Sequence, residues 1–242
     1  NVTDMSGMFE DNATFNDESV FNFNPIRVTD ASNMFKGTTS FEVSGAKNLN
    51  NKFLKNIGKD ASVSTINLSG MFDGSGYNRP VTTLLSNSKI TNTSNMFANS
   101  DYNSAITMNV SNVTDMSGMF QNNTAFDQDI EKWNVRNVIN FSEMFKDNTA
   151  FDQSINWGKK IHDDANLTEM FANTIINNSS LLSFDFKLKN REGYATMFNG
   201  NDTVTSENLP NAYENAQPDD GSGSSSGASS GATGGNSGSS GS

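Results

Sequence analysis

Few residues in this sequence could carry out catalytic chemistry. His162 is the only histidine, and Asp163 and Asp164 follow it directly, so an imidazole and two carboxylates could form a metal site or an acid–base pair. The chain has no second histidine and no cysteine to complete a usual zinc site or an activated nucleophile. We therefore interpret His162 as a surface loop residue, and we predict that the protein is not an enzyme.

Residues 73–78, Asp-Gly-Ser-Gly-Tyr-Asn, are a second candidate for ion binding. Oxygen ligands in a glycine-rich loop suit Ca²⁺, but this segment lacks the acidic spacing and the closing glutamate of an EF-hand loop. We expect no metal and no cofactor here.

The composition limits the class of partner. A formal charge of -11 and a pI near 4.4 argue against a nucleic-acid partner, because phosphate contacts need clustered lysine and arginine. No apolar run approaches the roughly 20 residues that a membrane span needs, so we expect no transmembrane segment. The chain starts at Asn1 within a repeat and without a signal peptide, so we expect a fragment whose targeting segment and anchor lie outside it.

The strongest pattern in the sequence is a repeated Met-Phe pair. Eight pairs recur at intervals of 23–27 residues, apart from one interval of 37. This period is typical of a stacked array, in which each unit buries its apolar side chains against its neighbours. The methionines that define copies 1 to 8 are Met8, Met34, Met71, Met96, Met119, Met144, Met170 and Met197.

Each pair lies in a segment that predicts a helix of about seven residues. An Asp or Asn stands four residues before the Met in copies 1–7, which suits a helix N-cap. In copies 6 and 7, Glu143 and Glu169 follow Asn140 and Asn166 by three residues, as in a capping box. The third residue after the Met is Gly, Asn or Asp in all eight copies. These types tolerate the left-handed backbone that follows a helix.

An aromatic residue and an alternating segment complete each unit. The aromatic residue stands seven residues after the Met in copies 1, 2, 5 and 6, and one place earlier in copies 3 and 4, at Tyr77 and Tyr102. Residues 106–110, 133–135 and 184–188 alternate large apolar with polar side chains and predict strands. Asn109, Asn134 and Asp185 would then lie on the outer sheet face. This polar strip could bind a ligand; the alternative is an Asn ladder that only keeps the sheet solvated.

The interval of 37 residues contains an insert at about 42–64. Leu49, Phe53, Leu54 and Ile57 lie at helical spacing, and the chain's basic cluster follows the other face. The cluster consists of Lys47, Lys52, Lys55 and Lys59. One interpretation is a projecting helix that docks an acidic partner. The commoner arrangement is an amphipathic insert with a solvated lysine face.

Three motifs carry a resemblance to a known family. They are V-T-D-M-S-G-M-F at 113–120, T-A-F-D-Q-D-I at 124–130 and W-N-V at 133–135. This pattern resembles the repeat of the BspA-like leucine-rich-repeat surface proteins, also called the mycoplasma lipoprotein-associated repeat, over residues 1–209. The resemblance implies a curved solenoid with a parallel sheet on one face, display on a cell surface, and adhesion or variable-antigen roles. The resemblance assigns no binding residue to this sequence, because the residues that match the motif have structural roles.

Together these patterns predict an α/β repeat solenoid over residues 1–209. About eight units of ~25 residues would each contain a short capped helix, a loop and a strand, with one parallel sheet along the array, as in leucine-rich repeats. Residues 210–220 are a predicted linker. Residues 221–242 are Gly and Ser apart from Ala228, Ala232, Thr233 and Asn236, which predicts a flexible tether, either a natural stalk or an expression scar.

The predicted function is non-enzymatic. We expect an extracellular, surface-anchored bacterial protein that binds a protein or glycan on a host or neighbouring cell, with self-association along the repeats as a further possibility. The alternative is a structural surface coat or spacer without a specific ligand.

Overall fold

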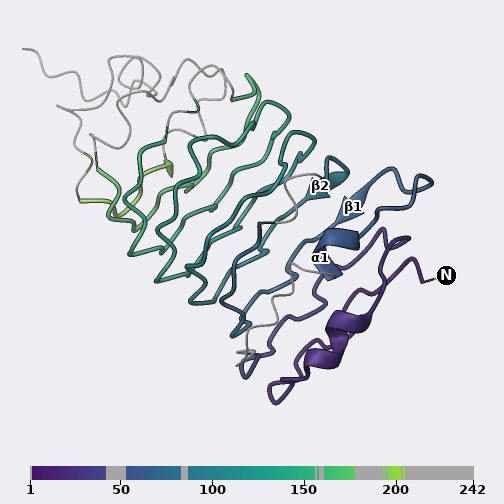
Figure 1. The fold of residues 1–242 in the computed structure, drawn as a ribbon. Coiled ribbons are helices and arrows are strands. Elements are labelled where there is room, and N and C mark those ends of the chain that lie inside the picture. Colours follow the sequence, from purple (N-terminus) through teal and green to yellow (C-terminus); the bar gives the residue numbers. More distant parts are fainter. Residues whose placement is uncertain are drawn as a thin grey trace, which may run out of the picture.

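The computed structural model describes residues 2–41, 53–82, 87–155, 157, 161–177, 193, 196–202 and 204. Successive copies lie side by side along one axis (Figure 1). The regular elements of this part are the 3-10 helix η1 at Glu18–Asn22, the α-helix α1 at Phe53–Asn56, and the parallel strands β1 at Ile66–Asn67 and β2 at Ile90–Asn92. The predicted strand at 184–188 and the predicted linker and tail lie outside the described residues.

A parallel ladder joins the copies at the residue four places before each Met. Strands β1 and β2 form its longest part, and isolated parallel bridges continue it on both sides. The bridges pair Asp4 with Asp30, Asp30 with Asn67, Asn92 with Asp115, Asp115 with Asn140, and Asn140 with Asn166. The column of Asp and Asn that the sequence assigns to helix N-caps therefore lies in the backbone pairing between copies.

The predicted strands at 106–110 and 133–135 are not formed. Ile106 makes one parallel bridge with Val81, and residues 107–110 and 133–135 have no strand. The predicted alternation of burial is nevertheless present, because Met108 and Trp133 are buried and Asn134 is exposed. Alternating hydrophobicity thus identifies the side that faces the core. Which segments pair depends on backbone contacts between copies.

The short helix predicted around each Met-Phe pair is not formed in copies 1–7. In each of them, six residues of consecutive turns begin two places after the ladder residue. In copy 5 the N–H of Met119 donates to the carbonyl of Met116, three residues earlier, at 3.2 Å. The N–H of Phe120 instead donates to the carbonyl of Met144 in the next copy, at 2.9 Å. Bonds within and between copies alternate in this way along the segment.

This alternation has a physical reason. The first four backbone N–H groups of a helix have no partner within it, so a seven-residue helix leaves most of its donors unpaired. In the stack, every second N–H of the segment donates to the following copy, as Asp11 does to Lys36 and Asp147 to Ala172. The turns therefore satisfy more of the backbone than the predicted helix would.

The prediction of left-handed backbone three residues after each Met is confirmed. The φ angle is positive at Asp11, Gly37, Gly74, Asn99, Asn122, Asp147, Asn173 and Gly200. A second left-handed position lies one residue before the Met and was not predicted. It is occupied by Gly7, Asn33, Gly70, Asn95, Gly118, Glu143 and Glu169. Both positions are the third residue of a hydrogen-bonded turn in copy 1, the position at which type II turns require a positive φ.

The capping boxes predicted in copies 6 and 7 are wrong, because no helix forms in either copy. Glu143 and Glu169 occupy the second left-handed position, and no helix follows either cap. Their carboxylates instead lie 3.5 Å and 2.6 Å from the ammonium of Lys146. The hydrogen bond between Lys146 and Glu169 raises the pKa of the lysine and lowers the pKa of the glutamate. These half-buried charges join neighbouring copies near the surface.

The Asp or Asn four residues before the Met does accept a local hydrogen bond, but in an Asx turn. Oδ1 of Asp115 accepts from the N–H of Ser117 at 2.9 Å and from its hydroxyl at 2.7 Å. The corresponding backbone bond is 2.8–3.1 Å in the other six copies that have this residue. The column therefore supports both the turn and the ladder.

Replacing Asp115 by Ala should lower the free energy of unfolding by about 1 kcal/mol, as the loss of a helix cap does, because the N–H of Ser117 loses its acceptor. Asp115→Asn keeps the acceptor and reproduces the residue found at Asn92 and Asn140, so it should change the stability little. Urea denaturation of the three proteins measures the difference. Equal losses in the two variants would show that the turn bond does not contribute.

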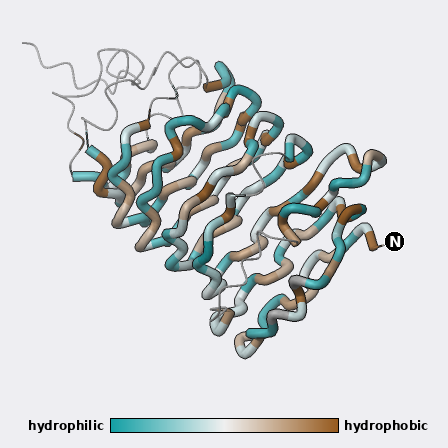
Figure 2. The backbone as a smooth tube through the Cα atoms, in the orientation of Figure 1, coloured by the Kyte–Doolittle hydropathy of each residue, from teal (hydrophilic) through white to brown (hydrophobic). Residues whose placement is uncertain are grey.

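The Met-Phe pair supplies the centre of the core. The eight phenylalanines of the pairs stack in one column, with ring centroids of consecutive copies 5.5–5.9 Å apart and interplanar angles of 5–15°. The paired methionines of copies 2–8 are buried, whereas Met8 in the first copy is 43% exposed. Hydrophobic and hydrophilic residues alternate along each copy (Figure 2). The apolar side chains thus form a narrow core that runs through the stack.

The insert is packed onto this core. Phe53, Leu54 and Ile57 are fully buried, and α1 contacts η1. The N–H of Gly58 donates to the carbonyl of Pro25 at 2.9 Å, which fastens the end of α1 to copy 1. The described part of the insert is therefore an amphipathic segment that lies against its neighbours rather than a projecting helix.

Candidate functional site

The residues singled out for catalysis lie on the surface. His162, Asp163 and Asp164 are exposed, and Nδ1 of His162 accepts a hydrogen bond from the backbone N–H of Asp164 at 3.2 Å. Among the described residues, no group of three or more His, Asp or Glu is placed to hold a metal ion. His162 thus has a local role in a turn.

Among the described residues, none of the helices has the length and hydrophobicity that a membrane span requires.

The polar strip proposed from the sequence is only partly described. Asn109 is half-buried, and its Oδ1 accepts from the N–H of Ser111 at 3.0 Å. Asn134 is exposed, and Asp185 lies outside the described residues. Because residues 133–135 form no strand, the polar strip does not lie on the regular sheet that the prediction assumed. Ligand binding there stays a prediction.

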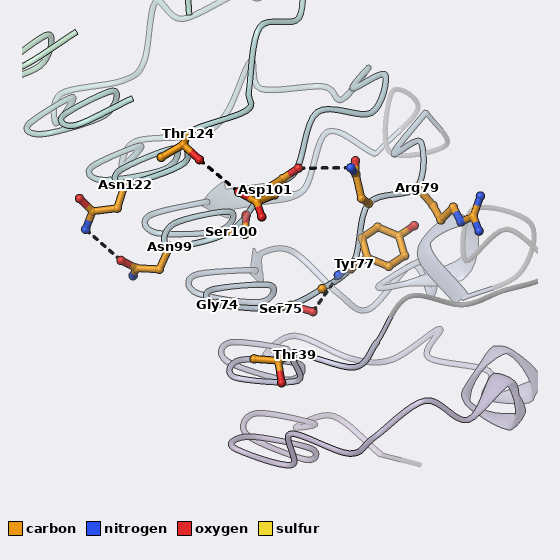
Figure 3. Close-up of a pocket in the computed structure, with 12 residues that line it drawn as sticks. Thr39, Gly74, Ser75, Tyr77, Arg79, Asn99, Ser100, Asp101, Asn122 and Thr124 are labelled. Carbon is orange, nitrogen blue, oxygen red and sulfur yellow. Dashed lines mark hydrogen bonds between the residues drawn. The ribbon is translucent and has the colours of Figure 1, made fainter. Parts of the chain in front are cut away.

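An open groove of about 930 Å³ lies across copies 2–5 in the described part of the chain. Its volume is at the upper end of the range for ligand pockets, about 300–1,000 Å³. The segment 73–78, considered above as a calcium loop, forms part of its wall. Asp101 and Arg79 are the charged residues of the lining, and hydroxyls, amides and glycine backbone supply most of the rest (Figure 3).

The groove arises where the repeat is locally shorter. In copies 3 and 4 the aromatic residues Tyr77 and Tyr102 come one place earlier than the phenylalanine of copies 5 and 6. Gly76 lies directly against copy 2, because a Cβ added there would be 2.3 Å from the carbonyl oxygen of Thr39. A Cβ added at Gly74 would instead make ordinary van der Waals contact with the backbone of Gly37 and Asn99, with no atom closer than 3.9 Å. Gly74 also lines the groove, so a larger side chain could be placed there without a steric clash at its Cβ.

Hydrogen bonds between copies hold the groove walls in place (Figure 3). Nδ2 of Asn122 donates to Oδ1 of Asn99 at 2.9 Å, and the hydroxyl of Thr124 donates to Oδ1 of Asp101 at 3.2 Å. On the opposite side, Nδ2 of Asn78 donates to the carbonyl of Asp101 at 3.2 Å. The walls are therefore preformed, and they present amide and hydroxyl groups to a ligand.

The two tyrosines beside the groove are buried and neutral. Burial raises the pKa of the hydroxyls of Tyr77 and Tyr102 well above the usual value. Tyr102 donates to the carbonyl of Ala105 at 3.2 Å, whereas the buried hydroxyl of Tyr77 has no hydrogen-bond partner among the described residues. Neither ring is available as a stacking surface, because the two side chains are at most 1% exposed. The groove therefore offers polar contacts without an exposed aromatic platform.

A column of buried polar side chains, two of which line the groove, was not predicted from the sequence. Its members stand four residues after each Met of copies 2–8: Thr38, Ser75, Ser100, Asn123, Asn148, Thr174 and Asn201. Nδ2 of Asn123 donates to carbonyls of copy 4, and its Oδ1 accepts from the N–H of Phe126 at 2.9 Å. The available signal was a small polar residue at one phase of every copy. Such residues are also common in exposed loops, so only the contacts reveal their burial.

The lysines of the insert are exposed where they are described. Lys55 and Lys59 are exposed, and Lys47 and Lys52 lie outside the described residues. The structure adds Lys89 to this cluster, because Lys55, Lys59 and Lys89 line one small cleft. The sequence separation of Lys89 from the insert concealed this relation.

Comparison with known proteins gives a family and no function. The family described as "Mycoplasma protein of unknown function, DUF285" matches four overlapping stretches, residues 1–59, 43–107, 66–184 and 93–211. No curated protein and no solved structure matches the chain. The four matches cover most of the chain and recur along it as the Met-Phe pairs do, so the chain belongs to this Mycoplasma family of repeat proteins.

Proposed function

We propose that the chain is a non-enzymatic repeat solenoid, displayed on the cell surface, that binds a protein or glycan of a host or neighbouring cell. The proposal rests on the groove of about 930 Å³, whose walls are fixed by hydrogen bonds between copies. The resemblance to BspA-like leucine-rich-repeat surface proteins supports surface display, and the ladder of parallel bridges supports a solenoid.

The lining favours a binding role over a catalytic one. Its side chains are mainly amides and hydroxyls, with one carboxylate at Asp101 and one guanidinium at Arg79. General acid–base or nucleophilic chemistry needs an activated pair of groups within hydrogen-bond reach. Amides and hydroxyls arranged along a groove instead suit many modest hydrogen bonds to a polar ligand.

Filling the groove should remove binding without unfolding the protein. Gly74→Asn places at this position the residue that Asn99 and Asn122 carry at the same phase with a positive φ. Because an added Cβ meets no atom closer than 3.9 Å, the variant should melt within a few degrees of the wild type. Ligands found by screening residues 1–218 against a glycan array and matrix proteins should bind the variant at least tenfold more weakly.

The control is Gly200→Asn, the same substitution at the same phase in copy 8, away from the groove. It should bind like the wild type. The side chain of Asn173 must move aside for the added Cβ there, so the melting temperature of the control is measured as well. Unchanged binding by Gly74→Asn would exclude the groove as the site and make Asn109 and Asn134 the next residues to test. The chain is a structural coat or spacer instead if the screen finds no ligand and analytical ultracentrifugation shows that the protein associates with itself into larger species.

A further inference from the structure

A second, smaller cleft lies between the insert and the start of copy 4. It has a volume of about 330 Å³, and Lys55, Lys59 and Lys89 line it together with Asn87 and Ser88. The three lysines come from two segments about 30 residues apart in the sequence. The cleft is thus a product of the fold and not of a local run of charge.

Hydrogen bonds fix the geometry of this cleft. Nζ of Lys89 donates to the carbonyl oxygens of Gly58 and Asp60 at 2.8 and 2.7 Å. Nδ2 of Asn87 donates to the carbonyl of Ile57 at 2.9 Å. The segment 87–89 is thereby fastened to the end of the insert, and the ammonium of Lys89 is held in place before any ligand arrives.

Buried side chains anchor the backbone of the segment that carries the other two lysines, Lys55 and Lys59. Phe53, Leu54 and Ile57 are fully buried, which anchors the backbone that carries Lys55 and Lys59. Both lysine side chains extend from this anchored segment into solvent. Because both side chains line the same cleft, their like charges repel each other.

Among the described residues, no carboxylate forms an ion pair with these three lysines. Within the part of the chain that the structure describes, no Asp or Glu oxygen lies within 4.0 Å of the ammonium of Lys55, Lys59 or Lys89. The carboxylate of Asp60 accepts instead from Ser62, at 2.6 Å from the hydroxyl, approaches Arg27 at 4.0 Å, and interacts with Lys89 only from beyond ion-pair distance. Three lysines without an ion-pair partner among the described residues therefore line one cleft, on a chain with a net charge of -11.

We propose that this cleft binds a tetrahedral oxyanion, a sulfate or phosphate group. Ammonium groups act as point charges that bind such anions without the planar geometry that arginine imposes. Asn87 and Ser88 add neutral groups that can donate hydrogen bonds. An anion in the cleft also relieves the repulsion between the lysines. The negative field of the whole chain opposes a long polyanion, so the ligand is a single anionic group, either free or as an ester.

The test is calorimetric titration of the whole chain with inorganic sulfate, inorganic phosphate and a sulfated disaccharide at low ionic strength. The double variant Lys55→Gln/Lys59→Gln should bind at least tenfold more weakly. Lys89 is kept, because its ammonium also bonds two carbonyls. The control Lys132→Gln/Arg136→Gln removes two exposed charges elsewhere and should bind like the wild type.

The outcomes distinguish a sulfate ester from a free oxyanion, and they test whether the cleft is the binding site. Tighter binding of the disaccharide, lost in the cleft variant, assigns the site to a sulfate ester. Equal binding of the free ions, lost in the same variant, assigns it to a free oxyanion. The proposal is wrong if none of the three probes binds, or if the cleft variant and the control weaken binding equally, because the effect would then reflect net charge alone.

Discussion

Replacing Phe120 by Ala should lower the free energy of unfolding by about 3–5 kcal/mol. The ring is fully buried and stacks on Phe126 at 3.7 Å, on Phe145 at 5.6 Å and on Phe97 at 5.9 Å. Removing the ring loses the free energy of burying it and leaves a cavity that the surrounding side chains, which come from three copies, cannot fill. Urea denaturation monitored by circular dichroism measures the loss.

The matched control is Phe9→Ala, the same change at the same phase in copy 1. Phe9 is only partly buried, and the neighbouring Met8 is 43% exposed. One copy packs against Phe9 where two pack against Phe120, so its loss should be less than half as large. If both variants lost equal stability, the energy would not be distributed as contacts between neighbouring copies.

Replacing Asn123 by Ala should lower the free energy of unfolding by about 2–4 kcal/mol, because buried hydrogen-bonding groups lose their partners. Its Oδ1 accepts from the N–H groups of Ala125 and Phe126 at 3.1 and 2.9 Å. Its Nδ2 lies 3.1 Å from the carbonyl oxygen of Tyr102 in the preceding copy. The side chain thus supports the turn of its own copy and the contact with the one before it.

Two further variants separate these roles in the same denaturation measurement. Thr124→Ala removes an exposed neighbour with one side-chain bond to Asp101 and should cost less than about 1 kcal/mol. Asn123→Ser introduces the residue that copies 3 and 4 carry as Ser75 and Ser100, so it should recover part of the loss. A loss for Asn123→Ala as small as that for Thr124→Ala would mean that water replaces the buried bonds.

The sequence alone was sufficient for some of the features that recur at one phase of the repeat. The Met-Phe spacing identified the units and the apolar side chains that are buried. The Gly, Asn or Asp three residues after each Met identified a left-handed backbone, because few other residue types adopt it readily. Asp115 and its equivalents were identified as acceptors of a local amide. Each of these inferences depends on the conformational or hydrogen-bonding preference of a single residue.

Only the tertiary structure decided which backbone groups pair and where the surface is hollow. The spacing around Met119 is compatible with a helix, yet the N–H of Phe120 pairs with the next copy, a contact that no local pattern encodes. The groove is lined by residues of copies 2–5 that are distant in the sequence, and the lysine cleft depends on Lys89 reaching the carbonyl of Gly58. Local preferences specify what a residue can do. Contacts between copies, distant in sequence, determine what it does.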